Sequence, residues 1–379
     1  MGEGTSSELL PQPTIARAWT SLPGMTSQRR IASIALVVAT AASVLAAGIQ
    51  AAGPRASFGW DERPTGTTSG LRGVSAVSDD VAWVSGSGGT VLRTLNGGAS
   101  WQSVAPPDAA GQAFRDIEAF DSETAVLLAI GPGEASRLYR TDDGGATWAK
   151  TFQNTVPTAF YDCMSFFDRK RGLVLGDPVD GRFQILSTDD GGRTWSLIPS
   201  TGMPATLPGE FAFAASGTCI ETAGGRDAWF ATGGDEVARV FHSDDRGLTW
   251  DVTETPVASG PTAGIYSLAF ASPRVGIAVG GDFQTPASAP NGAAYTTDGG
   301  ESWTISSGPG EYRSGSAWVS RLPKTAVAVG PTGSDVSRDG GRSWTRFDTG
   351  SLDAVDCVQT GACWGSGAAG RVARLRVDR

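Results

Sequence analysis

Histidine is almost absent from this sequence of 379 residues, since His242 is its only copy. Histidine is the commonest metal ligand and the usual proton acceptor in nucleophilic triads. A single copy inside a turn argues against histidine-based catalysis and against a histidine metal site, so we predict no metal. Glycine-rich phosphate loops between a strand and a helix are also missing. Their absence argues against nucleotide chemistry, and we predict no cofactor.

Basic charge is also scarce, because 30 lysine and arginine residues stand against 39 acidic ones, for a formal net charge of −9 at pH 7. The phosphate backbone of a nucleic acid repels an acidic chain, so we expect no nucleic-acid partner. The partners that we expect instead carry basic groups or recognise a local patch of the surface.

Long hydrophobic runs are missing except for one near the N-terminus. Arg29 and Arg30 precede an apolar stretch at residues 31–49, and small residues follow it. This pattern is typical of a signal peptide, either cleaved or retained as a membrane anchor. We therefore predict an N-terminal extension over residues 1–52 and an exported, periplasmic or extracellular, domain over residues 53–379. We expect a monomer whose only membrane contact would be the uncleaved anchor.

Glycine and tryptophan, in contrast, are plentiful, with 52 and 12 copies. Many of them belong to a turn motif whose clearest copy is STDDGGRTW. The motif recurs at intervals of 41 to 55 residues, and its copies end at Trp101, Trp148, Trp195, Trp250, Trp303 and Trp344. A period of this length, with several short strands in each repeat, is typical of β-propeller blades.

Each repeat predicts three short strands before the turn, as at residues 74–77, 81–85 and 91–94, and one strand after it. Six turns suggest six blades, but the chain ends supply a seventh. Shifted by 281 positions, the first repeat matches the C-terminus, for example Trp83 with Trp364, and this last copy stops before a fourth strand. Residues 56–62, which contain Trp60, have the right spacing to supply it. We therefore predict an all-β, seven-bladed propeller whose last blade is closed by an N-terminal strand.

Four cysteines in an exported chain predict disulfides, the alternative being four buried thiols. Cys357 and Cys363 flank a predicted tight turn in the last repeat, so their side chains can face each other across a hairpin. Cys163 and Cys219 fall near the first strands of consecutive repeats. We predict one bridge within each pair.

The turn motif resembles the Asp-box, or BNR repeat, S-x-D-x-G-x-T-W. This repeat occurs in sialidases, sortilin-type receptors, some glucanases and photosystem II stability/assembly factor-like propellers. The resemblance implies that the box is structural, with its aspartates tying the hairpin and its tryptophans packing beneath it. The aspartates to which we assign this role are Asp142, Asp189, Asp244, Asp298 and Asp339.

Between the turns, stretches such as FRDIEAF and FYDCMSFFDRKRGLVLGDPVDGRF most resemble the photosystem II stability/assembly factor-like propellers. This resemblance implies a non-catalytic scaffold that binds a protein or peptide client and assists a membrane or envelope complex. The alternative is a glycan-active hydrolase of the sialidase or glucanase type. A sialidase needs an arginine triad, and the usual Arg-Ile-Pro motif is missing. A glucanase needs a pair of carboxylates, and no spacing singles one out.

The first strand of each repeat should begin at one rim of the central channel. The residues at this level that we predict to form a binding surface are Arg72, Arg115, Asp116, Tyr161, Asp162, Tyr266, Tyr312 and Arg313, with Glu210 and Asp353 beside them. Arginine and tyrosine side chains together suit a peptide or an acidic group. The alternative is that these residues form ion pairs between blades at the channel mouth.

Overall fold

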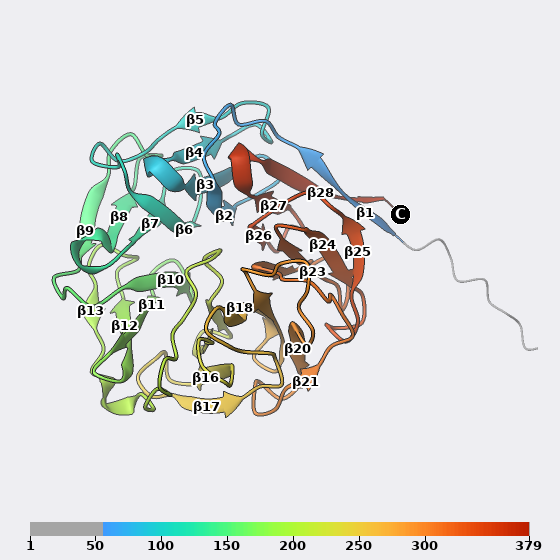
Figure 1. Ribbon diagram of the computed structural model, residues 1–379. Coiled ribbons are helices and arrows are strands. Elements are labelled where there is room, and N and C mark those ends of the chain that lie inside the picture. The colour runs from blue at the N-terminus through green and yellow to red at the C-terminus, as the bar shows by residue number, and fades with distance from the viewer. Residues whose placement is uncertain (1–55, 379) are drawn as a thin grey trace, which may run out of the picture. The chain divides into compact units, whose positions relative to one another are not determined.

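Seven four-stranded antiparallel sheets surround a central channel in the computed structural model of this protein, which describes residues 56–378 (Figure 1). In blades 1 to 6 the strand that comes first in the sequence lies next to the channel, and the later strands follow outward. The seven-bladed propeller predicted from the repeats is therefore confirmed.

The first three blades follow the chain from strand to strand. Blade 1 consists of β2 (Leu71–Ala76), β3 (Ala82–Gly86), β4 (Val91–Thr94) and β5 (Gln102–Ser103). Blade 2 consists of β6 (Ala113–Ala119), β7 (Ala125–Ile130), β8 (Arg137–Thr141) and β9 (Ala149–Gln153). Blade 3 consists of β10 (Tyr161–Phe166), β11 (Gly172–Val179), β12 (Arg182–Thr188) and β13 (Ser196–Leu197).

The next three blades have the same order. Blade 4 consists of β14 (Ile220–Ala223), β15 (Asp227–Ala231), β16 (Arg239–Ser243) and β17 (Asp251–Glu254). Blade 5 consists of β18 (Ala263–Ser272), β19 (Val275–Asp282), β20 (Ala293–Thr296) and β21 (Thr304–Ile305). Blade 6 consists of β22 (Gly315–Trp318), β23 (Ala326–Gly330), β24 (Gly333–Ser337) and β25 (Thr345–Asp348).

Blade 7 combines the two ends of the described chain. It consists of β26 (Ala354–Cys357), β27 (Cys363–Ser366), β28 (Val372–Asp378) and β1 (Ser57–Glu62). β1 pairs antiparallel with β28, and Trp60 lies opposite Leu375. Trp60 is 9% exposed, and its indole Nε1 donates a hydrogen bond to Ser334 Oγ of blade 6 at 3.0 Å. The predicted closure of the ring by an N-terminal strand is therefore confirmed.

Burial falls from the inner strands of each blade to the outer one. β7 and β23 are buried along almost their whole length, because neighbouring blades cover both faces of the strand. Their sequences, AVLLAI and AVAVG, are accordingly apolar throughout instead of alternating. β5, β13 and β21 lie at the outer edge, span two residues each and are exposed. The faces between adjacent blades thus form the core. The helices within residues 56–378 are single 3₁₀ turns, η1 (Ser87–Gly89), η2 (Gly133–Ala135), η3 (Ser200–Gly202) and η4 (Ala368–Gly370).

In five of the six recurrent turns, the aspartate that ties the turn lies five residues before the tryptophan, and Asn96 takes this place in the first turn. In the third turn, Asp190 accepts hydrogen bonds from the backbone N–H of Thr194 at 2.9 Å and from the hydroxyls of Thr194 and Thr188 at 2.7 and 2.8 Å. Asp298 and Asp339 make the equivalent bonds in the last two turns, as predicted.

In the second, third and fourth turns, which contain two adjacent aspartates, our assignment is wrong by one residue. Asp143, Asp190 and Asp245 make the turn bonds, instead of Asp142, Asp189 and Asp244. The first aspartate of each pair points outward and is exposed. The reason is geometric, because only a side chain four residues before the last hydroxyl residue can reach back across the turn.

Both predicted disulfides are present. Cys163 in β10 is bonded to Cys219, which directly precedes β14, with a Cα–Cα distance of 6.0 Å. This bridge therefore links the channel-lining strands of blades 3 and 4. Cys357 is bonded to Cys363 across the turn between β26 and β27, with a Cα–Cα distance of 4.1 Å.

No helix within residues 56–378 is long and apolar enough to cross a membrane. The predicted signal segment at residues 31–49, and the whole extension over residues 1–52, lie outside the described residues.

Candidate functional site

A long connection between blades 3 and 4 crosses the channel. We call residues 207–218 of this connection the channel loop. Ser216 Oγ donates a hydrogen bond to the backbone oxygen of Ser314, which precedes blade 6, at 2.6 Å. Gly217 lies against Asp116 of blade 2, so closely that a Cβ atom there would come within 2.4 Å of Asp116 Oδ1. The loop therefore spans the channel and separates its two ends.

Charged and backbone contacts hold the channel loop in place. Glu210 is buried and forms an ion pair with Arg239, with Nε and Oε1 at 2.9 Å. The backbone N–H of Ala212 donates to Asp177 Oδ1 at 3.0 Å. A charge pair of this kind inside the protein leaves an uncompensated charge if one partner is removed. The predicted rim residue Glu210 is therefore an anchor of the loop.

The channel loop covers the predicted rim tyrosines. Phe213 stacks on Tyr266 with ring centroids 3.9 Å apart, and Tyr266 contacts Tyr312 edge-on at 4.8 Å. Tyr266 and Tyr312 are 3% and 5% exposed. They pack beneath the loop and present no open aromatic surface.

Arg313 was predicted on the open rim, and this prediction is wrong. Its side chain is fully buried and pairs with Asp335, with Nε and Oδ2 at 2.7 Å. Its Nη1 donates to Thr332 Oγ1 at 2.9 Å and to the backbone oxygen of Tyr312 at 2.8 Å. The guanidinium thus has its partners within blade 6, neither on the open rim nor in an ion pair between blades.

Tyr161 and Asp162 are also buried in blade 3. Burial raises the pKa of Tyr161 to about 12. Burial and the neighbouring Asp177 raise the pKa of Asp162 well above its usual range. Both therefore belong to the interior beside the channel loop, away from the solvent-facing rim.

Arg72 and Arg115 are the predicted rim residues that remain half-buried at the channel. Each stands at a β-bulge in the first strand of its blade, where the ladder skips one residue. A bulge turns the unpaired side chain away from the regular alternation. Burial, together with the nearby Arg72, lowers the pKa of the Arg115 guanidinium to about 10. We call these two residues the arginine pair.

The arginine pair carries more charge than its surroundings neutralise. Asp353 of blade 7 is the nearby carboxylate whose charge acts on Arg115, and it is 8% exposed. Burial raises the pKa of Asp353, although Arg72 and Arg115 act in the opposite direction. Arg115 Nη1 is inaccessible and has no hydrogen-bond partner within residues 56–378. The pair can therefore offer donors to an anion.

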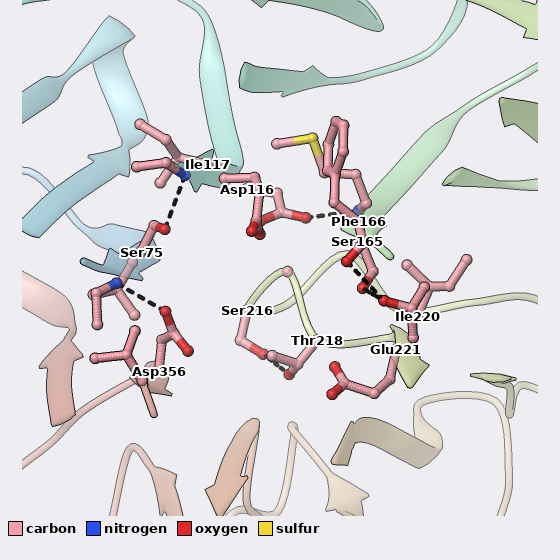
Figure 2. A pocket seen from close by; sticks show the side chains of 18 of the residues that line it. Ser75, Asp116, Ile117, Ser165, Phe166, Ser216, Thr218, Ile220, Glu221 and Asp356 are labelled. Carbon is pink, nitrogen blue, oxygen red and sulfur yellow. Dashed lines mark hydrogen bonds between the residues drawn. The ribbon is translucent and has the colours of Figure 1, made fainter. Parts of the chain in front are cut away.

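A cavity of about 370 Å³ lies on the other side of the channel loop. The innermost strands of several blades line it, and it reaches toward the turns after these strands. Four carboxylates face it: Asp116, Glu118, Glu221 and Asp356. Figure 2 shows Asp116, Glu221 and Asp356 around the cavity, with Ser216 and Thr218 of the channel loop among them. We call this cavity the acidic well.

Three of these carboxylates occupy one level of the ring. Glu118, Glu221 and Asp356 each pair across the ladder with the same position of the second strand, namely Val126, Trp229 and Trp364. Two well carboxylates also link neighbouring blades. Asp356 Oδ2 accepts a hydrogen bond from the Ala76 backbone N–H at 2.8 Å, and Asp116 Oδ2 accepts one from Met164 at 2.7 Å.

Burial holds the well carboxylates partly protonated near neutral pH. It raises the pKa of Asp116 to about 7, of Glu221 to about 8 and of Asp356 to about 6. Burial and the negative charges of Asp356 and Asp116 also raise the pKa of Glu118 well above its usual range. Chemically, the well can accept protons or bind a cation.

Sequence reasoning placed Asp116 at the rim and missed Glu118, Glu221 and Asp356. Asp116 and Glu118 alternate along β6, so both face the well. The repeat alignment contained a usable signal, because the shift of 281 positions that matches the first repeat to the last aligns Ser75 with Asp356. Marking polar residues at that level in every repeat would have revealed the carboxylates.

No protein-family model matches this chain, and no curated protein matches it. Among solved structures, it is similar to YCF48 bound to D1 peptide, with 14% identity and a TM-score of 0.59 over 84% of this chain and 95% of that one. It is also similar to YCF48 from Cyanidioschyzon merolae, with 17% identity and a TM-score of 0.60 over 84% and 98% of the two chains.

A glycoside hydrolase has a related fold. The GH74 xyloglucanase from Xanthomonas campestris matches with 16% identity and a TM-score of 0.57, over 83% of this chain and 53% of that one. Identities this low show a common propeller fold. They leave the activity to be argued from the site itself.

Proposed function

We propose that this protein is a non-catalytic, exported scaffold that binds a protein or peptide partner at the arginine pair. The observation that carries the proposal is the meeting of two guanidinium groups from adjacent blades, one of which has a buried nitrogen without a partner. Guanidinium forks bind carboxylates through paired hydrogen bonds, and arginine often dominates interface energetics. A similar fold has been solved with a peptide bound, which supports this class of partner.

The envelope setting is part of the proposal. The apolar segment at residues 31–49 supports export to the periplasm or the cell exterior, with the propeller acting as a monomer. The resemblance to photosystem II stability/assembly factors supports a client in a membrane or envelope complex.

The arginine pair can be tested with one double substitution. We expect Arg72→Ala with Arg115→Ala to abolish capture of envelope proteins by the tagged chain while the melting temperature stays unchanged. Binding by the unaltered protein should weaken as salt rises, because exposed charges are screened within about 8 Å at physiological ionic strength. Capture from the native envelope, followed by mass spectrometry and a thermal melt of the same variant, measures both quantities.

A matched control removes the same charge elsewhere. Arg274 and Arg321 are exposed and lie in the turns after the first strands of blades 5 and 6, at the opposite end of the channel. Their double alanine variant should keep full capture. If the arginine-pair variant instead melts earlier and keeps its partners, the two guanidinium groups serve ion pairing between blades, and the proposal fails.

A glycan-active hydrolase is the second candidate. The observation that favours it is a group of carboxyls with raised pKa values in one cavity, since glycosidases need a protonated carboxyl as general acid. Incubation with sialosides, β-glucan and xyloglucan tests it. Turnover that disappears in Asp116→Asn would make this protein an enzyme, whereas no turnover leaves the scaffold as the supported function.

A further inference from the structure

The acidic well is a blind pocket. The channel loop closes one end, because Gly217 lies against Asp116 and Ser216 is bonded to Ser314 across the channel. The other end opens among the turns after the first strands, where Val77, Phe120 and Val358 line the mouth. A ligand must therefore enter with one end leading, pass the apolar side chains of the mouth and stop at the channel loop.

The well contains carboxylates with few donors. Asp116 is only 7% exposed, and its donors are backbone N–H groups, those of Met164 and Ile117. Glu118 is half-buried and has neither a hydrogen bond nor an ion pair among residues 56–378, and no lysine, arginine or histidine of that range lines the well. Carboxylates removed from bulk water without donors are costly, so buried polar groups nearly always have partners.

We propose that the acidic well binds the primary ammonium group of a slender alkyl chain. An ammonium group has three donors, which suits carboxylates that reach it from different blades. Its methylene stem can lie along the apolar mouth while the charged end sits deeper, as lysine stems do on apolar surfaces. The described residues contain no group of three or more acidic, histidine or cysteine side chains close enough to hold a bare metal ion. A wider, hydrogen-bonding organic cation is therefore the better fit.

The same chemistry has two sources, a lysine side chain of a partner protein and a free polyamine. Isothermal titration calorimetry on the full chain, with cadaverine and with a short acetylated lysine peptide as separate probes, distinguishes them. Binding of the peptide alone assigns the site to a protein partner, and binding of cadaverine alone assigns it to a polyamine. Binding of neither probe overturns the proposal, and so does equal competition by calcium chloride.

Glu118→Gln is the decisive variant, because it keeps the size of the side chain and removes the unpaired charge. We expect ammonium binding to weaken about tenfold, as for the loss of one charge-assisted hydrogen bond, while the thermal melt shows an intact fold. Glu221→Gln should weaken binding in the same direction. Glu301→Gln removes an exposed carboxylate from the recurrent turn of blade 5 and should leave binding unchanged. Unchanged binding in both well variants would refute the site.

Proton release supplies an independent readout. The well carboxyls are partly protonated near pH 7 because burial raises the pKa of Asp116 to about 7 and of Glu221 to about 8. A bound cation favours their ionised forms, so binding should strengthen from pH 6 to pH 8 and release protons. Titrations in two buffers with different ionisation heats measure this release. The arginine-pair variant should bind the probes normally, so a failure of the proposed function and a failure of this site remain distinguishable.

Discussion

At the scale of single residues, the same carboxyl group exists in two opposite states in this molecule. Although burial raises the pKa of Asp190, hydrogen bonds from Thr194, Thr188 and the Arg193 backbone outweigh it and lower the value to about 2. Asp116 receives fewer donors, and burial raises its pKa to about 7. The balance between burial and the number of nearby donors thus decides whether an aspartate is held ionised or partly protonated.

The turn aspartates lead to a prediction with a neighbouring control. Asp190→Ala should lower the stability of the protein by roughly 1–2 kcal/mol, because the turn loses a hydrogen-bonded anchor. Asp189→Ala should leave the stability almost unchanged, since Asp189 is exposed and makes no turn bond. Urea unfolding of both variants measures the difference. Equal losses of stability would mean that both adjacent carboxylates stabilise the turn.

At the scale of elements, β1 is the piece on which ring closure depends. It covers the edge of β28, and Trp60 inserts between blades 7 and 6. An uncovered strand edge offers free backbone donors and acceptors to other chains. Closure thus protects the sheet edge and completes the core between blades 6 and 7.

Trp60→Ala tests closure without removing the strand. We expect a loss of about 3–5 kcal/mol, the usual cost of truncating a buried tryptophan, and a greater tendency to aggregate. Ser57→Ala, at the exposed start of the same strand, serves as the control. Urea midpoints and light scattering report the two effects. A Trp60→Ala midpoint equal to that of the control would show that blade 7 is stable without this contact.

At the scale of the whole molecule, the channel has opposite charge at its two ends. The arginine pair stands at the end where the first strands begin, and the acidic well opens at the other, with the channel loop between them. The arginine pair therefore favours an anionic partner, whereas the acidic well favours a cationic one. An effect of binding at one site on affinity at the other would have to be transmitted through the channel loop.

The well carboxyls predict an unusual pH dependence of stability. A carboxyl whose pKa is raised in the folded state binds more protons when folded than when unfolded, so stability falls as pH rises through that window. For Asp116, Glu221 and Asp356 the window runs from about pH 4 to about pH 8, and the raised pKa of Glu118 acts in the same direction. The turn aspartates have lowered pKa values, and their contribution is lost only below about pH 4.

We therefore expect the melting temperature to be higher at pH 5 than at pH 8. Asp116→Asn should raise it at pH 8 and flatten the profile, because the amide no longer has to ionise in the well. Differential scanning calorimetry across this range, with Glu301→Gln as the control, measures the effect. A melting temperature that climbs steadily from pH 5 to pH 8 would contradict the raised pKa values.

The sequence by itself determined the architecture. The recurring turn, the apolar strands and the match between the two ends of the chain predict seven blades and the strand that closes them, and the structure has both. These features are local or periodic, so a linear reading detects them. The paired cysteines were predictable for the same reason, since Cys357 and Cys363 flank one turn and Cys163 and Cys219 start consecutive repeats.

Only the tertiary structure decided which channel residues are open. Arg313 lies one residue earlier in its repeat than Arg72 does, at the level of the buried Leu71, and it meets Asp335 inside its own blade. Arg72, in contrast, stands at a bulge beside Arg115. The channel loop buries Tyr266 and Tyr312, although its own sequence gives no sign of where it crosses. The acidic well brings together Glu118, Glu221 and Asp356 from blades 2, 4 and 7. These carboxylates are far apart in the sequence, and they become neighbours only because the blades close into a ring around one axis.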